Sequence, residues 1–190
     1  LVGPYYNKPP QEAFYQHFKT IAEATSLPIM IYNVPGRTGS NILPATIARL
    51  AQIDNIVAVK EASGNLDQVM EIIRTTPPDF KVYSGDDNLT LPIVAVGGVG
   101  VVSVAAHVVG NQMQEMLAAF FAGDYAKAQA INSKLLPFFK VIFITTNPIP
   151  IKAAVNLLGL NAGPVRLPLI EASPAEVEKI KAVMEQLNIL

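Results

Sequence analysis

The sequence contains no cysteine, which excludes both a disulfide framework and a thiolate metal site. Its two histidines, His17 and His107, are far apart and have no acidic cluster nearby, which argues against a zinc enzyme. No apolar run reaches membrane-spanning length, because the longest, Leu91–Ala106, is interrupted by one proline and three glycines. No signal peptide is visible, so we expect a cytoplasmic protein.

Charged residues are also scarce. They make up 15% of the 190 residues, against 51% hydrophobic residues and a mean hydropathy of +0.34, whereas about a quarter of a typical soluble domain is charged. The net charge of -1, without charge runs, argues against nucleic acid or an anionic membrane as the main partner. The apolar excess instead suggests surface that is covered by other subunits.

The first part of the chain alternates apolar segments of strand length with segments of helical period. The strand candidates are continuously apolar, as expected for parallel strands buried on both faces. One strand in about every 20 to 30 residues corresponds to one βα unit and predicts a parallel sheet. The predicted strands are Pro28–Val34, Ile56–Ala62, Lys81–Gly85 and Gly100–Ala106, and the predicted helices are Gln11–Ala24, Pro44–Ala51, Leu66–Thr75 and Asn88–Val96.

The remainder of the chain has a helical pattern without further strands. The last helix follows "SPAE", which begins with Ser173 and is typical of a capping box with proline in the first turn. We therefore predict an α/β fold in residues 1–110 and a helical region in residues 111–190. The predicted helices of this region are Gln112–Ala122, Tyr125–Lys140, Ile149–Leu158 and Pro174–Leu187.

Lys60 follows the apolar run Ile56–Val59 without a break, in "NIVAVKEASGN". A buried lysine is costly unless its charge is paired or removed. In an apolar pocket its pKa falls, and the neutral amine can then attack a carbonyl group to form a Schiff base. The alternatives are a lysine that extends to the rim of the sheet or one that pairs with Glu61, although neighbours on a strand point to opposite faces.

Tyrosines and an arginine stand at two other predicted strand ends. In "YNVPGRTG", Tyr32 offers a phenol that donates and accepts a proton, and Arg37 offers a fork for a carboxylate. The alternative is a core tyrosine followed by an ordinary turn with a surface arginine. Leu1–Tyr6 has the pattern of a strand end, where Tyr5 and Tyr6 serve either chemistry or aromatic packing.

Three other motifs favour structural interpretations. Asp86 and Asp87 in "SGDD" could hold a metal or act as an acid–base pair, but a helix N-cap is the simpler interpretation. Gly97–Gly100 lacks the six-residue phosphate fingerprint and predicts a turn from helix to strand. Lys152 in "NPIPIK" follows two prolines that open a helix, and we expect it to be structural or solvated.

Together, "PYYNKPPQE", "YNVPGRTG", "KEASGN", "YSGDD" and "NPIPIK" resemble the dihydrodipicolinate synthase family. This family belongs to the pyruvate-dependent, Schiff-base-forming aldolases that include N-acetylneuraminate lyase. The resemblance extends over essentially the whole sequence and implies a TIM (β/α)8 barrel, present here from the end of strand 4 onward. A C-terminal helical extension would follow, so the chain would correspond to the C-terminal two-thirds of the family's fold.

The resemblance also implies a reaction in lysine (diaminopimelate) biosynthesis that needs no metal or organic cofactor. Lys60 would form an imine with pyruvate, whose enamine attacks L-aspartate 4-semialdehyde to give 4-hydroxy-tetrahydrodipicolinate. Tyr32 would move protons, and Tyr6 would do so across a dimer interface within a homotetramer built as a dimer of dimers. Arg37, which the lyases generally lack, would hold the carboxylate of the semialdehyde.

Further positions match the family less completely. Gly85 and Val102 match positions around the imine, and Tyr5 matches the lysine-feedback site. The threonine pair that relays protons between the two tyrosines is absent from this sequence, so we expect no turnover from these residues alone. Two alternatives remain open: an aldolase that uses pyruvate or another 2-keto acid, and a fragment with a purely structural or interaction role.

Overall fold

The computed structural model describes all 190 residues and divides them into two compact units, Leu1–Val102 and Ser103–Leu190. This boundary lies before the one predicted after residue 110. The reason is local, because the backbone N–H of Ala106 donates to Ser103 Oγ at 2.8 Å and helix α6 (Ala106–Phe121) begins there. The helix therefore belongs as a whole to the second unit.

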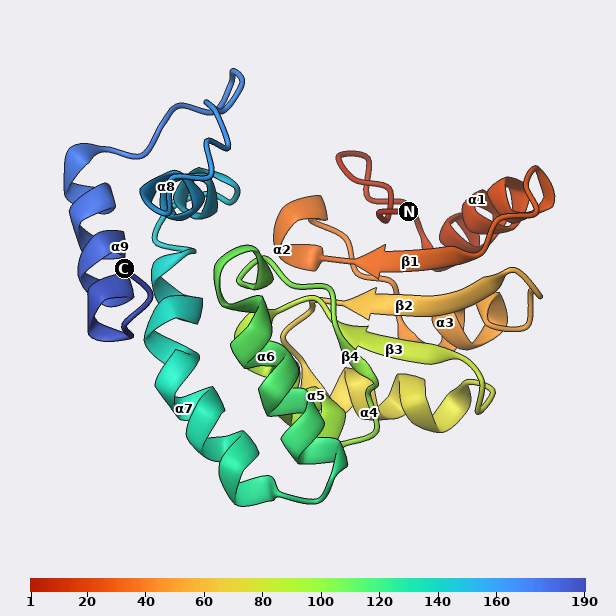
Figure 1. The fold of residues 1–190 in the computed structure, drawn as a ribbon. Helices are drawn as coiled ribbons and strands as arrows, with labels where there is room; N and C mark the ends of the chain where they lie inside the picture. Colours follow the sequence, from red (N-terminus) through yellow and green to blue (C-terminus); the bar gives the residue numbers. More distant parts are fainter. The chain divides into compact units, whose positions relative to one another are not determined.

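The first unit is built on a parallel sheet with the strand order β1-β2-β3-β4 (Figure 1). This arrangement confirms the predicted α/β class. The sheet within this chain has four strands and is not a closed barrel. One bridge between Val2 and Tyr32, also parallel, adds the start of the chain to the free edge of β1. The strands are β1 (Ile29–Asn33), β2 (Ile56–Glu61), β3 (Lys81–Ser84) and β4 (Gly100–Val101).

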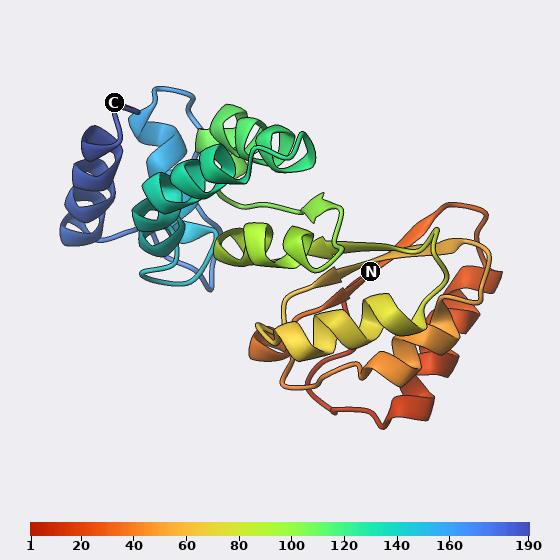
Figure 2. The same cartoon turned by 90° about the horizontal axis from the view of Figure 1, so that it is seen from below.

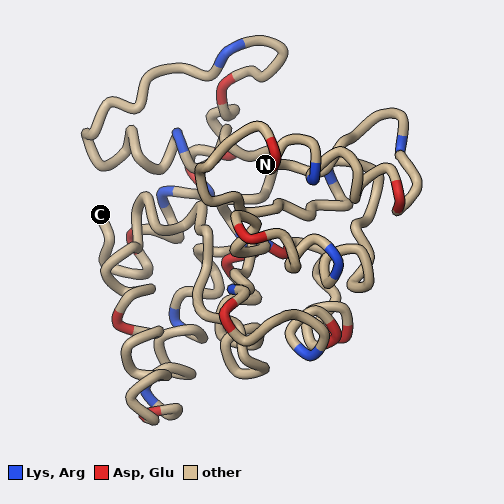
Figure 3. The backbone as a smooth tube through the Cα atoms, turned by 90° about the vertical axis from the view of Figure 1, so that its right-hand side faces the viewer, with Lys and Arg blue, Asp and Glu red and all other residues tan.

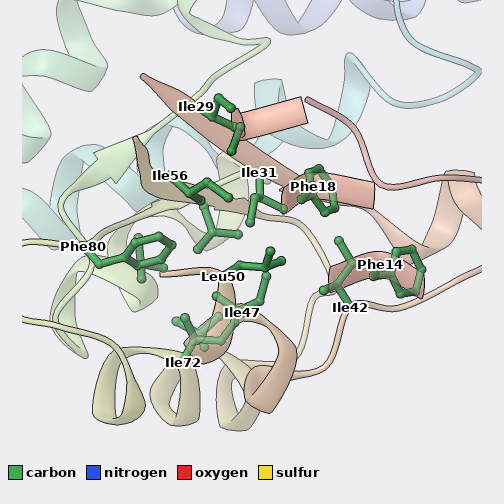
Figure 4. Close-up of a cluster of buried hydrophobic side chains, with 14 of the residues drawn as sticks. Phe14, Phe18, Ile29, Ile31, Ile42, Ile47, Leu50, Ile56, Ile72 and Phe80 are labelled. Carbon is green, nitrogen blue, oxygen red and sulfur yellow. The ribbon is translucent and has the colours of Figure 1, made fainter. Parts of the chain in front are cut away.

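Helices α1, α3 and α4 cover one face of this sheet (Figures 1 and 2). Apolar side chains from these helices and from the strands form one buried cluster, shown in Figure 4. Full burial of each such side chain contributes about 1.5–3 kcal/mol. Packing of the helices on this face therefore stabilises the folded first unit. The helical elements are α1 (Gln11–Glu23), α2 (Pro35–Thr38), α3 (Pro44–Leu50), α4 (Leu66–Thr75), the 3-10 helix η1 (Asp87–Leu89) and α5 (Thr90–Ala95).

Two sequence predictions in the first unit are wrong in detail. The strand predicted over Gly100–Ala106 pairs only at Gly100 and Val101, because the following residues turn into α6. The segment after Tyr32, for which an ordinary turn was one interpretation, forms one turn of helix, α2, which ends where Gly39 adopts a left-handed conformation with a φ of 68°. The strand and helix positions otherwise follow the hydrophobic pattern closely.

The second unit consists of helices, as predicted. Helix α6 packs along α7, and α9 packs against both α7 and α8. The predicted capping box at Ser173 and Glu176 is confirmed, since each residue's side chain accepts from the other's backbone N–H, at 3.3 and 2.7 Å. Besides α6, the helices are α7 (Tyr125–Val141), α8 (Ile149–Leu157) and α9 (Pro174–Gln186).

Charged residues are interspersed along the backbone in Figure 3 rather than gathered by sign. The ion pairs join exposed side chains, for example Arg49 with Glu12 and Arg74 with Glu71. Exposed pairs of this kind contribute about 0–1 kcal/mol each. None of the helices combines the length and the apolar character needed to cross a membrane.

Candidate active site

Three strands place a tyrosine, the lysine and a second tyrosine side by side. Lys60 on β2 is in register with Tyr32 on β1 and with Tyr83 on β3. Paired residues of a parallel sheet share a face, and alternate residues point to opposite faces. Since Ile31 and Val59 belong to the buried cluster under the helices, the Tyr32–Lys60–Tyr83 row points away from that helical layer.

The amine of Lys60 lies over the ring of Tyr32, with 4.2 Å between Nζ and the ring centroid. Its position is consistent with a cation–π contact when the amine is charged. Desolvation by burial lowers the pKa of Lys60, while the carboxylates of Asp87 and Asp86 oppose this shift and Arg37 adds to it. The net pKa lies below the ordinary value for lysine, so more of the amine is neutral and nucleophilic.

Tyr32 responds to the same environment in the opposite sense. Desolvation by burial raises the pKa of its phenol, Arg37 lowers it, and Asp86 raises it further. The raised pKa keeps the hydroxyl protonated at neutral pH. A protonated phenol beside a partly neutral amine is suited to proton transfer during attack on a carbonyl group.

Gly85 lies along the stem of Lys60. Its backbone N–H donates to the carbonyl of Glu61 at 2.7 Å, which brings the chain after β3 close to the end of β2. A Cβ at position 85 would lie 3.2 Å from Cε of Lys60 and 2.6 Å from Cβ of Ala62. Glycine is therefore required here by close approach. The chain after β4 is held to the end of β3 in the same way, because the N–H of Val102 donates to the carbonyl of Ser84 at 2.9 Å.

Asp86, which follows β3, does not act as the helix cap that the sequence predicted. Asp86 occupies the N-cap position of η1 but its side chain makes no capping hydrogen bond there. Instead, Ser84 Oγ donates to the carbonyl of Asp86 at 2.7 Å. Burial, Asp87 and Glu61 raise the pKa of Asp86, and Lys60 lowers it. Sequence reasoning missed this electrostatic link, although "SGDD" follows the strand next to that of Lys60.

The other predicted site residues differ in how closely they approach Lys60. Arg37 is exposed on α2, and its charge lowers the pKa of both Tyr32 and Lys60. Tyr5 and Tyr6 are 65% and 91% exposed, so neither packs into the Lys60 site within this chain. Tyr6 also adopts a left-handed backbone conformation, with a φ of 59°.

The two histidines and Lys152 make local contacts. Nδ1 of His107 lies 2.9 Å from the carbonyl of Val104, and the ring of His17 packs edge-on against Phe18. Lys152 Nζ donates to the carbonyl of Pro164 at 2.8 Å. No group of three or more histidine, aspartate or glutamate side chains is arranged to hold a metal ion.

Comparison with known proteins identifies the family to which this arrangement belongs. Residues 1–187 match the model of the dihydrodipicolinate synthetase family. The chain belongs to this family. It is 60% identical, over 191 aligned residues, to the 4-hydroxy-tetrahydrodipicolinate synthase of Cyanothece sp., and the match covers all of this chain and 65% of that relative. The chain thus spans slightly less than two-thirds of the relative's length.

Two solved structures of this dihydrodipicolinate synthetase family share the fold. The enzyme from Cyanidioschyzon merolae with lysine bound is 47% identical, with a TM-score of 0.97, over 100% of this chain and 64% of that one. The chloride-inhibited enzyme from Acinetobacter baumannii complexed with pyruvate is 39% identical, with a TM-score of 0.96, over 100% and 65%. Which part of the family's fold the chain represents, predicted above as the C-terminal two-thirds, stays a prediction.

Proposed function

We propose that the whole protein condenses pyruvate with L-aspartate 4-semialdehyde through an imine on Lys60, giving 4-hydroxy-tetrahydrodipicolinate for lysine biosynthesis. The observation that carries this proposal is the Lys60 amine, which is partly desolvated at a strand end and lies 4.2 Å from the ring centroid of Tyr32. Identity of 60% to a relative with this activity supports the same reaction.

In the proposed reaction, neutral Lys60 Nζ attacks the keto carbon of pyruvate. The resulting carbinolamine loses its hydroxyl as water and becomes an imine, and loss of a methyl proton then gives the enamine. Tyr32 donates a proton to the departing hydroxyl, for which its raised pKa is suitable. The pyruvate complex of the Acinetobacter relative supports pyruvate as the first substrate.

Further residues are assigned to the binding of the second substrate and to the surroundings of the imine. The enamine carbon attacks the aldehyde of the semialdehyde, whose oxygen takes up a proton, while Arg37 binds that substrate's carboxylate through its planar fork. The amino group of the semialdehyde then attacks the imine carbon, and the Lys60 amine leaves as the ring closes. The charge of Arg37 lowers the pKa of both Tyr32 and Lys60, which supports this assignment. Gly85 and Val102 would bound the imine, and Tyr5 would belong to a lysine-feedback site.

The proposal extends to architecture and assembly. The four parallel strands would be an arc of a (β/α)8 barrel, and the bridge from Val2 to Tyr32 supports a further strand at the β1 edge. The enzyme would be a cytoplasmic homo-oligomer, a dimer of dimers. The nearly complete exposure of Tyr6 supports its insertion into a neighbouring subunit's site.

Trapping with borohydride tests the central step. The protein as naturally expressed is incubated with pyruvate and borohydride, and the reduced adduct is mapped by peptide mass spectrometry. We expect the adduct on Lys60 and none in a Lys60→Ala variant, whereas Lys81→Ala at the exposed start of β3 should label normally. An adduct on another lysine, such as Lys8 or Lys152, would refute the assignment, and no adduct at all would favour a non-catalytic role.

Two further comparisons test the rest of the proposal. Turnover with L-aspartate 4-semialdehyde should exceed turnover with other aldehydes, and a preference for another aldehyde would indicate a different 2-keto-acid aldolase. Mixed oligomers of inactive Tyr6→Phe and inactive Lys60→Ala subunits should regain activity. Mass-verified hybrids without activity would show that Tyr6 does not act across the interface.

A further inference from the structure

A buried carboxylate lies directly behind the candidate active site. Glu61 follows Lys60 on β2 and is in register with Asn33, which follows Tyr32 on β1. The side chains of Glu61 and Asn33 are both 1% exposed. Because successive residues of a strand point to opposite faces, this pair points to the helical layer while Lys60 and Tyr32 point away from it.

The Glu61 carboxylate accepts hydrogen bonds from three neutral donor groups. Asn33 Nδ2 donates to its two oxygens at 3.0 and 3.3 Å. Gln68 Nε2 on α4 donates at 3.3 Å, and the backbone N–H of Ser63 donates at 2.7 Å. A carboxylate is the side chain that offers acceptors only, so a glutamine at position 61 would turn an NH2 group toward donors.

The amides around Glu61 are held in one orientation. The backbone N–H of Ile42 donates to Asn33 Oδ1 at 3.0 Å, and a backbone N–H cannot accept, so Nδ2 of Asn33 must face Glu61. Asn41 closes the network, because its Oδ1 accepts from Asn33 at 2.8 Å and its Nδ2 donates to Gln68 Oε1 at 2.8 Å. Asn33, Asn41, Glu61 and Gln68 thus form a hydrogen-bonded group, called here the carboxylate network.

We propose that Glu61 is a positioning residue that fixes the Lys60 amine relative to the Tyr32 hydroxyl. The inference rests on the proposed function of Lys60. The carboxylate network joins β1, β2 and α4 at the residues next to Tyr32 and Lys60, so any relaxation at Glu61 moves both reacting side chains. A displacement of about 1 Å between reacting groups can slow a reaction about 100-fold.

The test compares Glu61→Gln with Glu71→Gln in the naturally expressed protein. Glu71 is a matched control, because it is a glutamate whose side chain is 45% exposed and pairs with Arg74 at the surface. We expect Glu61→Gln to lower the rate of imine formation at saturating pyruvate about 10- to 100-fold. The pyruvate concentration for half-maximal rate should change less than about 2-fold, since Glu61 touches the positioning network and not the bound substrate. Glu71→Gln should change neither value.

A second variant keeps the inference testable if Glu61→Gln does not fold. Asn41→Ala removes the link between Asn33 and Gln68 at a half-buried position. It should lower the rate of imine formation several-fold and leave the pyruvate concentration for half-maximal rate nearly unchanged. Folding is checked by circular dichroism and by the melting transition. Normal imine formation in the folded variants, or an equal loss in rate and pyruvate affinity, would overturn the inference. Absence of imine in the unchanged protein would instead overturn the proposed function, and this inference with it.

Discussion

Replacement of Gly85 by alanine tests whether close packing at the end of β3 determines the position of Lys60. The new Cβ would meet Ala62 Cβ at 2.6 Å, a separation that real structures do not show, and the carbonyl oxygen of Glu61 at 3.2 Å. The backbone at Gly85 cannot easily retreat, because its N–H is bound to Glu61 at 2.7 Å. Overpacking of this kind typically costs about 1–3 kcal/mol.

The expected result is a free energy of unfolding lowered by about 1–3 kcal/mol, measured by urea denaturation with tyrosine fluorescence. Gly36→Ala is the matched control, because a Cβ at Gly36 meets nothing within 4 Å. The control variant should be as stable as the unchanged protein or more stable by up to about 1 kcal/mol, because Gly36 lies in helix α2. A Gly85→Ala variant as stable as Gly36→Ala would refute the packing argument.

A double variant separates the effect on stability from the effect on Lys60. Ala62→Gly removes the closest contact, so Gly85→Ala with Ala62→Gly should recover much of the loss, with a coupling energy of about 1–2 kcal/mol. The contact of 3.2 Å with Cε of Lys60 remains in the double variant. Imine formation should therefore stay slow although stability returns. Recovery of both together would show that the Lys60 stem adapts freely.

Three further predictions concern charge at the site. Lys60→Met should raise the free energy of unfolding at neutral pH, because the pKa of Lys60 is lowered in the folded protein and its charge therefore disfavours folding below that pKa. The advantage of the variant should shrink as the pH rises toward 10.5. An advantage that is the same at every pH would contradict this reasoning. Asp86→Asn should shift the pH profile of imine formation to lower pH, because Asp86 raises the pKa of Lys60, whereas exposed Asp79→Asn should not. Arg37→Ala should reduce use of the semialdehyde at least about 10-fold more than pyruvate trapping, with exposed Arg74→Ala as control; equal losses would assign Arg37 to holding the loop.

The parallel sheet and the position of Lys60 could be predicted from the sequence, because each depends on a local pattern. Continuously apolar runs such as Ile56–Val59 encode strands buried on both faces, and a polar residue at the end of such a run is visible without a structure. The helices of the second unit were similarly predictable from their periodicity, and the cap at Ser173 from its spacing to Glu176.

Local patterns were insufficient where neighbours in space decide the outcome. The strand predicted over Gly100–Ala106 has a strand-like composition, but the connection to α6 takes its last residues into a helix. Asp86 suits a cap by composition, yet its side chain makes no capping hydrogen bond and its charge acts on Lys60 of the neighbouring strand. Propensity describes single segments, and these outcomes depend on which segments meet.

The sequence by itself determined which residue carries the amine and which strand ends carry the phenol and the guanidinium. Only the tertiary structure decided the environment that makes them reactive. Burial and the charge of Arg37 lower the pKa of Lys60 against the opposing charges of Asp87 and Asp86. The need for glycine at position 85 comes from the side chains of Lys60 and Ala62, and the acceptor role of Glu61 comes from donors on β1 and α4. Each depends on residues from different helices and strands, which are brought together only once the chain has folded.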